Sequence, residues 1–258
     1  MTDTHHTNPT PPETEPWLLT GVVLYSTGAP EADALLVREG MIAWIGQADS
    51  AAVLHPEART VEATGCLVTP SFVDAAATAD GSAPDPTGEK AAAALGITQR
   101  LPGPTGEREG MQVIAPVTET APLRTLSGDG TPIAFGSAGA VEARDPWSWV
   151  RAAALEGDPA ERLSDRAAFL AATRGGRRLA GEMHPGDLRT GSPATFVVWE
   201  PWDLTVRSSA PRPRESWSTD PRSRTPLLPD LDHGSPRALL TVVNGALAYD
   251  ALTQKKAP

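Results

Sequence analysis

Strand patterns at both ends of the chain, with helical patterns only between them, set the strongest limit on the fold. Glu39-Gly40 separates two β-type runs near the start, and Asn244-Gly245 separates two more near the end. Glycine accepts the positive φ of a tight turn, and Asn-Gly is the strongest short-range hairpin signal. Further β-type runs lie at residues 18–25, 59–61, 66–68 and 195–199. Neither end has enough strands to bury an apolar face alone, so we expect both ends to build one β-sandwich.

The middle of the chain alternates strand-length apolar runs with alanine-rich helical segments. The predicted strands are residues 67–73, 111–117 and 132–135, and the predicted helices are residues 91–95, 147–155 and 167–179. Asp145 followed by Pro146 is a typical helix start, and so is Ser164 followed by Asp165. Strands that alternate with helices predict βα units in a mainly parallel arrangement.

These patterns divide the chain into parts. Residues 1–16 are predicted to be a disordered tail, because prolines stand there among polar residues with almost nothing apolar to bury. Residues 17–65 plus 190–252 are assigned to the composite β-sandwich, and residues 66–189 to the βα domain. Within the sandwich part, the stretch at 201–236 is rich in proline and arginine, and it is predicted to be a solvated loop rather than a phosphate site.

Charge and cysteine content exclude several classes of function. Lys+Arg 22 against Asp+Glu 32 gives a formal net charge of -10, so the basic surface that a nucleic-acid backbone requires is missing. No apolar stretch approaches the roughly 18 residues of a membrane span, and the polar start is unlike a signal peptide. Cys66, the single cysteine, is expected to be a buried structural thiol. We therefore expect a cytoplasmic protein without nucleic-acid or membrane partners.

Several local strings resemble one known family. Residues 40–46 (GMIAWIG) and 63–74 (ATGCLVTPSFVD) are similar to the opening of the amidohydrolase superfamily, where a β-sandwich leads into a barrel strand that ends in Pro-Gly-Phe-Val-Asp and then His-x-His. Residues 132–137 (PIAFGS) resemble the eighth barrel strand of that family, and residues 186–194 (GDLRTGSPA) its return to the sandwich. The resemblance implies a composite β-sandwich with a (β/α) barrel. It also implies metal-dependent hydrolysis of carbon-nitrogen bonds other than peptide bonds.

The chain departs from the family at the positions that would hold the metal. Ala76 and Thr78 stand where the resemblance places the two histidines that follow Asp74, and Ala138 stands where it places the final, proton-accepting aspartate. Neither alanine nor threonine replaces an imidazole as a ligand of a catalytic metal. Asp74, Ala76, Thr78 and Ala138 are therefore predicted to be vestigial site positions, and we expect no metal and no cofactor.

The length of the chain also indicates that the family's barrel is incomplete here. A closed eightfold barrel takes about 250 residues and at least about 200, whereas residues 66–179 number about 114. We therefore expect an α/β fold in which the composite β-sandwich stands beside a truncated, incomplete (β/α) barrel. Because exposed strand edges favour association, a homo-oligomer or a partner that covers the open barrel edges is expected.

Two hypotheses about function follow. The first is a catalytically inactive, metal-free member of the family that acts in binding or assembly and holds a small-molecule ligand. The alternative is an active hydrolase on a small cyclic amide or related substrate, with its metal held by Asp80, His184 and His233 or by a partner chain. In that case the three side chains would converge to about 2.0–2.2 Å from a common point.

Three other features are interpreted as structural. Asp80 is expected to be a solvated loop residue rather than part of an acid/base pair. Gly175-Gly176 is expected to break a helix beside solvated arginines rather than to bind an anion. Trp147 and Trp149 are expected to pack in the core rather than to stack on a ligand.

Overall fold

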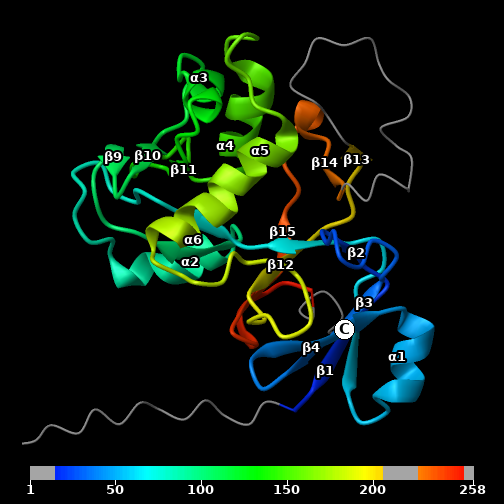
Figure 1. Cartoon of the computed structure of the whole chain (residues 1–258). Coiled ribbons are helices and arrows are strands. Elements are labelled where there is room, and N and C mark those ends of the chain that lie inside the picture. Colours follow the sequence, from blue (N-terminus) through cyan, green and yellow to red (C-terminus); the bar gives the residue numbers. More distant parts are fainter. Residues whose placement is uncertain (1–14, 206–225, 253–258) are drawn as a thin grey trace, which may run out of the picture.

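The computed structural model describes residues 15–205 and 226–252 (Figure 1). Its first sheet takes all four strands from the N-terminal part of the chain. In spatial order they are β4 (Met41–Gly46), β3 (Ala34–Arg38), β1 (Trp17–Thr20) and β5 (Arg59–Glu62). β1 runs antiparallel to β3 and parallel to β5. Helix α1 (Ala48–Leu54), which was not predicted, covers one face of this sheet through Ala51.

The second sheet combines strands from both ends of the chain. In spatial order it contains β16 (Ala246–Asp250), β15 (Ala238–Val243), β12 (Phe196–Trp199), β6 (Leu67–Pro70) and β2 (Val23–Leu24). β6 lies inside the range 66–189, yet it pairs with β12 and β2, so this sheet includes residues that were assigned to the βα domain. The predicted hairpins at Glu39-Gly40 and Asn244-Gly245 are both confirmed.

The two sheets pack against each other around one apolar cluster, and the turns of the two hairpins touch. Ala194 connects the turns, because its N–H donates to Gly40 O at 2.8 Å while its carbonyl accepts from Gly245 N at 2.9 Å. A Cβ on Gly40 would lie 2.9 Å from Asn244 O, so glycine is required there. Members of the cluster include Trp17, Leu35, Ile42, Val68, Phe196 and Leu240. Segments from both ends of the chain thus meet in one sandwich.

Two predicted strands are each divided between different sheets. The apolar run at 18–25 becomes β1 and β2, with Gly21 between them at φ +76, and a Cβ on Gly21 would lie 2.9 Å from Thr64 Oγ1. This left-handed residue turns the chain, so one apolar run contributes to both faces of the core. The run at 67–73 is divided in the same way at Ser71, between β6 and β7 (Phe72–Asp74).

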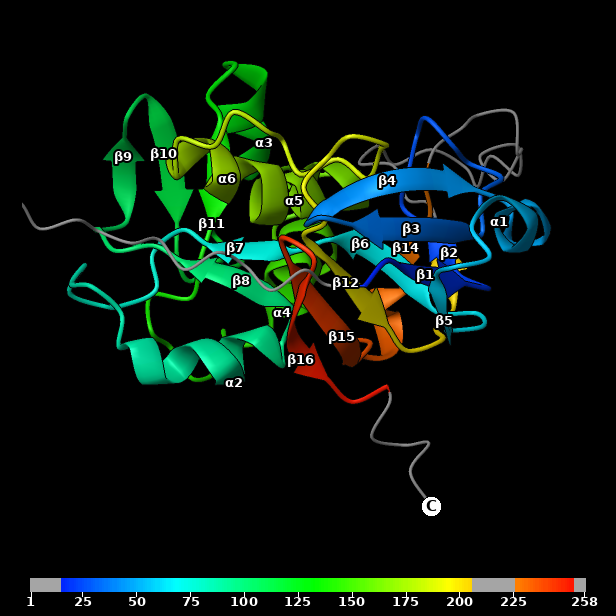
Figure 2. The same cartoon turned by 90° about the horizontal axis from the view of Figure 1, so that it is seen from below.

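The βα part contains four parallel strands and one antiparallel strand, whose arrangement can be followed in Figure 2. β7 pairs with β8 (Ile97–Arg100), while β11 (Ile133–Phe135) pairs with β10 (Met111–Ile114) and β10 with β9 (Gly106–Arg108). Ala75 N donates to Phe135 O at 3.0 Å, and Ala138 N to Ala76 O at 2.7 Å, which links β7 to β11. The parallel strands therefore lie in the order β8, β7, β11, β10, with antiparallel β9 at the end. β8 and β9 were not predicted.

Short helices cover these strands. They are α2 (Glu89–Ala93), α3 (Leu123–Gly128), α4 (Pro146–Arg151), α5 (Asp165–Leu170) and α6 (Gly176–Leu179), and a 3-10 turn (Pro86–Gly88) precedes α2. π-helical segments at Ala152–Glu156 and Ala171–Gly175 continue α4 and α5. Both predicted helix starts are confirmed, because the Asp145 carboxylate accepts from Trp147 N at 3.0 Å and Ser164 Oγ accepts from Ala167 N at 3.2 Å.

An aromatic core joins the helices to the sandwich. The ring of Phe72, the first residue of β7, is fully buried and lies 5.0 Å from Trp147, 5.6 Å from Phe169 and 5.9 Å from Trp199, between ring centroids. Trp199 belongs to β12 of the sandwich, so this core extends across both parts of the molecule. The prediction that Trp147 and Trp149 pack in the core is confirmed, since their exposures are 0% and 1%.

The predicted helix break at Gly175-Gly176 is wrong. Their φ values, -57 and -61, are helical, and the helix runs through them from α5 to α6. The glycines allow this helix to lie directly on the strands, because a Cβ on Gly175 would come 2.2 Å from Ile133 O and one on Gly176 would come 2.5 Å from Val73 Cβ. Arg177, which was expected to be solvated, is 4% exposed.

Part of the predicted loop at 201–236 has regular structure. β13 (Leu204–Thr205) pairs with β14 (Leu228–Pro229), and a 3-10 turn (Leu231–His233) follows. Trp202 Nε1 donates to Asp230 O at 2.7 Å, which ties the two flanks together. Residues 206–225 lie outside the described residues, as does most of the predicted tail at 1–16.

Cys66 is buried, and burial raises the pKa of its thiol, which agrees with the expected structural role. Within residues 15–205 and 226–252, no helix has both the length and the apolar character needed to cross a bilayer.

Candidate functional site at the carboxyl ends of the parallel strands

The carboxyl ends of β7, β8 and β11 meet at one edge of the parallel strands. Leu101 N donates to Asp74 O at 2.8 Å, and the hydrogen bonds of Ala75 and Ala138 connect β7 with β11. A Cβ on Gly139 would lie 3.5 Å from Thr78 Cα, so the loops that follow β7 and β11 are also in contact. The structure therefore brings together all four positions selected from the sequence, at the strand ends where barrel enzymes carry their sites.

The carboxylate of Asp74 joins β7 to β11. Ser137 donates to it twice, through Oγ at 2.6 Å and through its backbone N at 2.9 Å, and Ala76 N donates at 3.3 Å. A Cβ on Gly136 would lie 2.7 Å from Asp74 Oδ1, so glycine allows this close approach. Burial raises the pKa of Asp74 above its usual value, although the hydrogen bonds from Ser137 and Ala76 and the charge of Arg100 oppose the rise.

Thr78 and Asp80 belong to the loop that follows β7. Thr78 Oγ1 donates to Ser82 O at 2.7 Å, and Ser82 N donates to the Asp80 carboxylate at 3.0 Å. Asp80 is exposed, and its hydrogen bonds with Ser82 hold the pKa of this carboxyl below its usual value. Asp80 is thus a solvated loop residue, as expected.

Arg108 is one of the charged residues at this edge that the sequence analysis missed, together with Arg100 and Arg144. Its guanidinium donates to Ala75 O at 2.7 Å and to Pro102 O at 2.8 Å, so β9 is tied to the ends of β7 and β8. A Cβ on Gly103 would lie 2.5 Å from Arg108 Cζ, so Gly103 makes room for the guanidinium. The arrangement holds a permanent positive charge at the backbone carbonyls of Ala75 and Pro102, just after β7 and β8.

A repeated tripeptide could have revealed Arg108. Glu109-Gly110-Met111 repeats Glu39-Gly40-Met41, which was recognised as a hairpin signal. Both glutamates have φ +51, and the glycines have φ +73 and +75. The same turn therefore pairs β9 with β10 and places Arg108 on the strand just before it.

The side chains at this edge do not fit the divalent metal that the resemblance implies. Ala76 and Ala138 supply no donor atom, and both oxygens of Asp74 already accept hydrogen bonds. In the described part of the chain, no three His, Cys, Asp or Glu side chains form a group that could hold a metal ion.

The alternative ligand set of Asp80, His184 and His233 does not form within the described chain, so that prediction is wrong for these three residues. Asp80 is in the loop after β7, and His233 ends the 3-10 turn after β14. His184 follows α6, and its Nδ1 accepts a hydrogen bond from Gly186 N at 3.0 Å. Ligands supplied by a partner chain remain a separate prediction.

A cavity of about 270 Å³ opens beside Asp74, between α2 and the loop after β11. Two arginines line it, Arg100 and Arg144, together with Ser137. Arg100 Nη1 donates to Asp85 O at 2.8 Å, whereas Arg144 is exposed. The remaining lining is mainly apolar and includes Ala77, Ala91, Ala92, Leu95 and Ile97. The cavity therefore combines an apolar wall with two arginines and the carboxyl group of Asp74.

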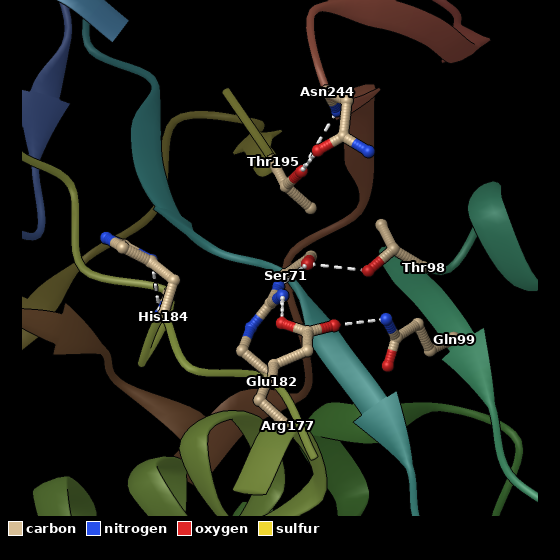
Figure 3. A network of polar contacts seen from close by, with 9 residues as sticks. Ser71, Thr98, Gln99, Arg177, Glu182, His184, Thr195 and Asn244 are labelled. Carbon is tan, nitrogen blue, oxygen red and sulfur yellow. Dashed lines mark hydrogen bonds and ion pairs between the residues drawn. The ribbon is translucent and has the colours of Figure 1, made fainter. Parts of the chain in front are cut away.

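A second polar cluster lies at the amino end of β7 (Figure 3). Arg177 donates to Glu182 Oε2 at 2.9 Å and to Ser71 Oγ at 2.5 Å, and Ser71 Oγ is 2.7 Å from Thr98 Oγ1. Gln99 donates to the same Glu182 carboxylate. His184 stands apart from these contacts in Figure 3. These hydrogen bonds hold α6 against β7 and β8. Buried Arg177 therefore has a structural role.

Comparisons with known proteins agree at the level of the fold. No protein-family model matches the sequence, and no curated protein matches it significantly. Solved structures do match. A triazine hydrolase variant aligns with TM-score 0.57 and 12% identity, covering 93% of this chain and 96% of that chain. The chain has the amidohydrolase fold.

Two further amidohydrolase-fold structures support this assignment. An amidohydrolase from Thermotoga maritima gives a TM-score of 0.55 at 12% identity, covering 90% of this chain and 99% of that chain. An enamidase described as a new member of the amidohydrolase superfamily gives 0.50 at 11% identity, covering 90% and 95%. At such low identities the amidohydrolase fold is established, whereas the chemistry has to be argued from the site.

We expect Asp74 to titrate above about 3.9, the ordinary value for aspartate. Because its pKa is raised, the folded state holds more protons than the unfolded state between the two values, and stability falls as pH rises through that window. Ser137→Ala removes one hydrogen bond to the ionised form and should raise the pKa of Asp74 further. Carboxyl-carbon NMR titration measures the pKa of Asp74 in the parent chain and in Ser137→Ala. Asp80, whose pKa is lowered, is the internal control, and an Asp74 pKa at or below about 3.9 would contradict the assignment.

Proposed function

We propose that this chain is a shortened member of the amidohydrolase superfamily that binds a small ligand and does not hydrolyse it with a metal-activated water. The observation that carries the proposal is the role of Asp74. Its carboxylate connects two strands through Ser137, while alanines occupy the neighbouring positions that would supply ligands. Catalytic zinc needs three protein ligands and an open position for water, and this edge lacks such a set of side chains.

The strand order supports the loss of the middle of the barrel. β7 and β8 match the place of the first βα units in the family, and β10 and β11 match the place of the last ones, with β11 beside β7 as barrel closure requires. Residues 66–179 are about 114, against about 200 for the smallest closed barrels. The missing strands would lie between β8 and β10 in the sequence, where the antiparallel strand β9 stands instead.

The cavity beside Asp74 indicates the class of ligand. Its volume of about 270 Å³ is close to the lower limit of roughly 300 Å³ for ligand pockets, so the ligand is small. Arg100 and Arg144 favour an acidic group, and the alanine-rich wall with Leu95 and Ile97 favours a short apolar body. A small organic acid fits both requirements.

The alternative function is hydrolysis with metal ligands supplied by a partner chain. It is favoured by the neighbours in structure, one of which is a mutant of the atrazine chlorohydrolase of Arthrobacter aurescens complexed with zinc and atraton (TM-score 0.56, 13% identity). The open edges of β8 and β9 could receive a partner. However, β8 carries Gln99 and Arg100, and β9 carries Glu107 and Arg108, and polar and charged side chains of this kind protect an edge from pairing.

Metal analysis of the dialysed full chain distinguishes the two functions. We expect less than stoichiometric zinc, iron and manganese, no increase in Tm on adding zinc, and no hydrolysis of small cyclic amides. Stoichiometric metal that survives dialysis would contradict the proposal. Running the same analysis on His184→Ala and His233→Ala would show whether either histidine holds that metal, and ultracentrifugation would show whether metal binding requires an oligomer.

The binding function has its own test. Arg144→Gln should weaken binding of a small aliphatic carboxylate such as butyrate by about tenfold, because it removes a charge-assisted contact. Arg59→Gln, an exposed arginine on β5, is the matched control and should leave binding unchanged. If the parent chain, Arg144→Gln and Arg59→Gln all bind butyrate with equal affinity, a ligand site beside Asp74 is contradicted.

A further inference from the structure

A second cavity, of about 310 Å³, shares no lining residue with the cavity beside Asp74. It is lined by three chain segments: the loop that follows β2, the helix formed by α5 and its π-helical continuation, and the loop at 185–189 that leads to β12. Pro70, which precedes β7 by two residues, also lines it. The cavity therefore sits at the amino end of β7, where the sandwich meets the helices.

Three arginines gather at this cavity in a chain whose formal net charge is -10. Arg174 pairs with Asp187 at 2.8 Å, and both side chains are about half exposed. Arg166 and Arg189 also line the cavity, and no ion pair joins either of them to a carboxylate of the described residues. After the Arg174–Asp187 pair is set aside, two positive charges remain at the cavity.

A buried hydroxyl without a partner provides a second, independent observation. Tyr25 is 8% exposed, and its ring packs edge-on against Phe169 with centroids 4.9 Å apart. Its hydroxyl is buried and has no hydrogen-bond partner among residues 15–205 and 226–252. Buried polar groups in folded proteins are nearly always paired, so a lone hydroxyl points to a missing ligand or water.

The hydroxyl belongs to the cavity electrostatically. Burial raises the pKa of Tyr25 to about 12, and the charges that act on it are those of Arg166, Arg174 and Asp187, all of which line the cavity. At neutral pH the group is therefore an O–H donor beside cationic groups. Ser26, the residue after Tyr25, is firmly held to the loop at 185–189, because its Oγ donates to Leu188 O at 3.0 Å inside the protein.

We propose that this cavity binds the phosphate or carboxylate group of a small molecule, with Tyr25 donating a hydrogen bond and Arg166 and Arg189 supplying the charge. An anion with two or more terminal oxygens accepts from the phenol and from a guanidinium at once, which is the geometry that favours arginine over lysine. The hydroxyl is covered in the unbound chain, so binding requires a small movement of the side chains that line the cavity. This site is separate from the one proposed beside Asp74.

Calorimetric titration of the full chain at constant ionic strength tests the site, with inorganic phosphate and acetate as the two probes. Tyr25→Phe keeps the ring packing and removes only the hydroxyl, so it should weaken binding of the preferred anion about tenfold or more. Arg166→Gln should do the same. Tighter binding of phosphate than of acetate would identify a phosphate site, and the reverse order a carboxylate site.

Two control variants make the result specific. Arg59→Gln, on the edge strand β5, should leave anion binding unchanged, whereas Arg144→Gln reports binding at the separate cavity beside Asp74. The Tm of unliganded Tyr25→Phe should equal or exceed that of the parent chain, because the substitution removes an unpaired buried group. The proposal is overturned if neither anion binds saturably, or if Tyr25→Phe and Arg166→Gln bind both anions as the parent does. If anion binding is lost only in Arg144→Gln, the binding site is the cavity beside Asp74 instead.

Discussion

Phe72→Ala is expected to lower the free energy of unfolding by about 4 kcal/mol, the largest effect of any single replacement considered for this chain. The ring has no exposed surface and contacts four other aromatic rings, Trp147, Trp149, Phe169 and Trp199. Alanine would leave a cavity that these large, mutually packed rings cannot fill by small shifts. Because Trp199 is in the sandwich and Trp147 in α4, the loss should loosen both parts of the molecule together.

Chemical denaturation with tryptophan fluorescence measures this effect, since three of the neighbouring rings are indoles. Val53→Ala is the control, because Val53 is 79% exposed on α1 and its truncation should change stability by no more than about 0.5 kcal/mol. A loss below about 1 kcal/mol for Phe72→Ala would mean that the aromatic core does not join the two parts as described.

Gly175→Ala is expected to destabilise the fold by about 2 kcal/mol even though alanine is the better helix former. In an exposed helix the same change would stabilise by up to about 1 kcal/mol. Here the added Cβ would lie 2.2 Å from Ile133 O and 3.1 Å from Ala134 Cα, so the helix has to move away from β11. The sign of the measured change therefore decides between helix propensity and close packing.

Gly128→Ala is the matched control for this prediction. Gly128 is the last residue of α3, and a Cβ there would meet no atom within 4 Å. Thermal unfolding of the two variants should show a lower Tm for Gly175→Ala and an unchanged or slightly higher Tm for Gly128→Ala. Equal shifts in the two variants would contradict the contact between this helix and β11.

The sequence was most informative where local chemistry determines local structure. The turns at Glu39-Gly40 and Asn244-Gly245 and the caps at Asp145 and Ser164 each depend on a few adjacent residues, and each was predicted correctly. The runs at 18–25 and 67–73 were recognised as β structure, but their division between sheets depends on distant partners. Apolar periodicity does not report which sheet a residue joins.

The candidate site was predicted in part. The β-type run that ends at Asp74 and the run that precedes Ala138 could be placed side by side through the family resemblance, and the structure brings these positions together. Arg108 was missed because β9 is short and polar, so it has no apolar pattern, although its turn repeats a tripeptide already recognised. The burial of Arg177 was missed because Gly175-Gly176 is locally a helix-breaking signal. In the fold, these glycines instead allow the helix to pack closely on β7 and β11.

The contact between the hairpin turns at Gly40 and Asn244-Gly245 also constrains how the protein can be made. β6 emerges from the ribosome well before its neighbour β12, and the bond between Thr69 and Trp199 spans 130 residues of chain. Until β12 and β15 are made, only β2 and β6 of the second sheet can cover the apolar inner face of the first sheet. Long-range pairing of this kind slows folding and leaves intermediates that are prone to aggregate. We therefore expect the nascent N-terminal half to expose apolar surface of the kind that chaperones bind, and a circular permutation that places β15 and β16 before β1 should shorten the time for which this surface is exposed.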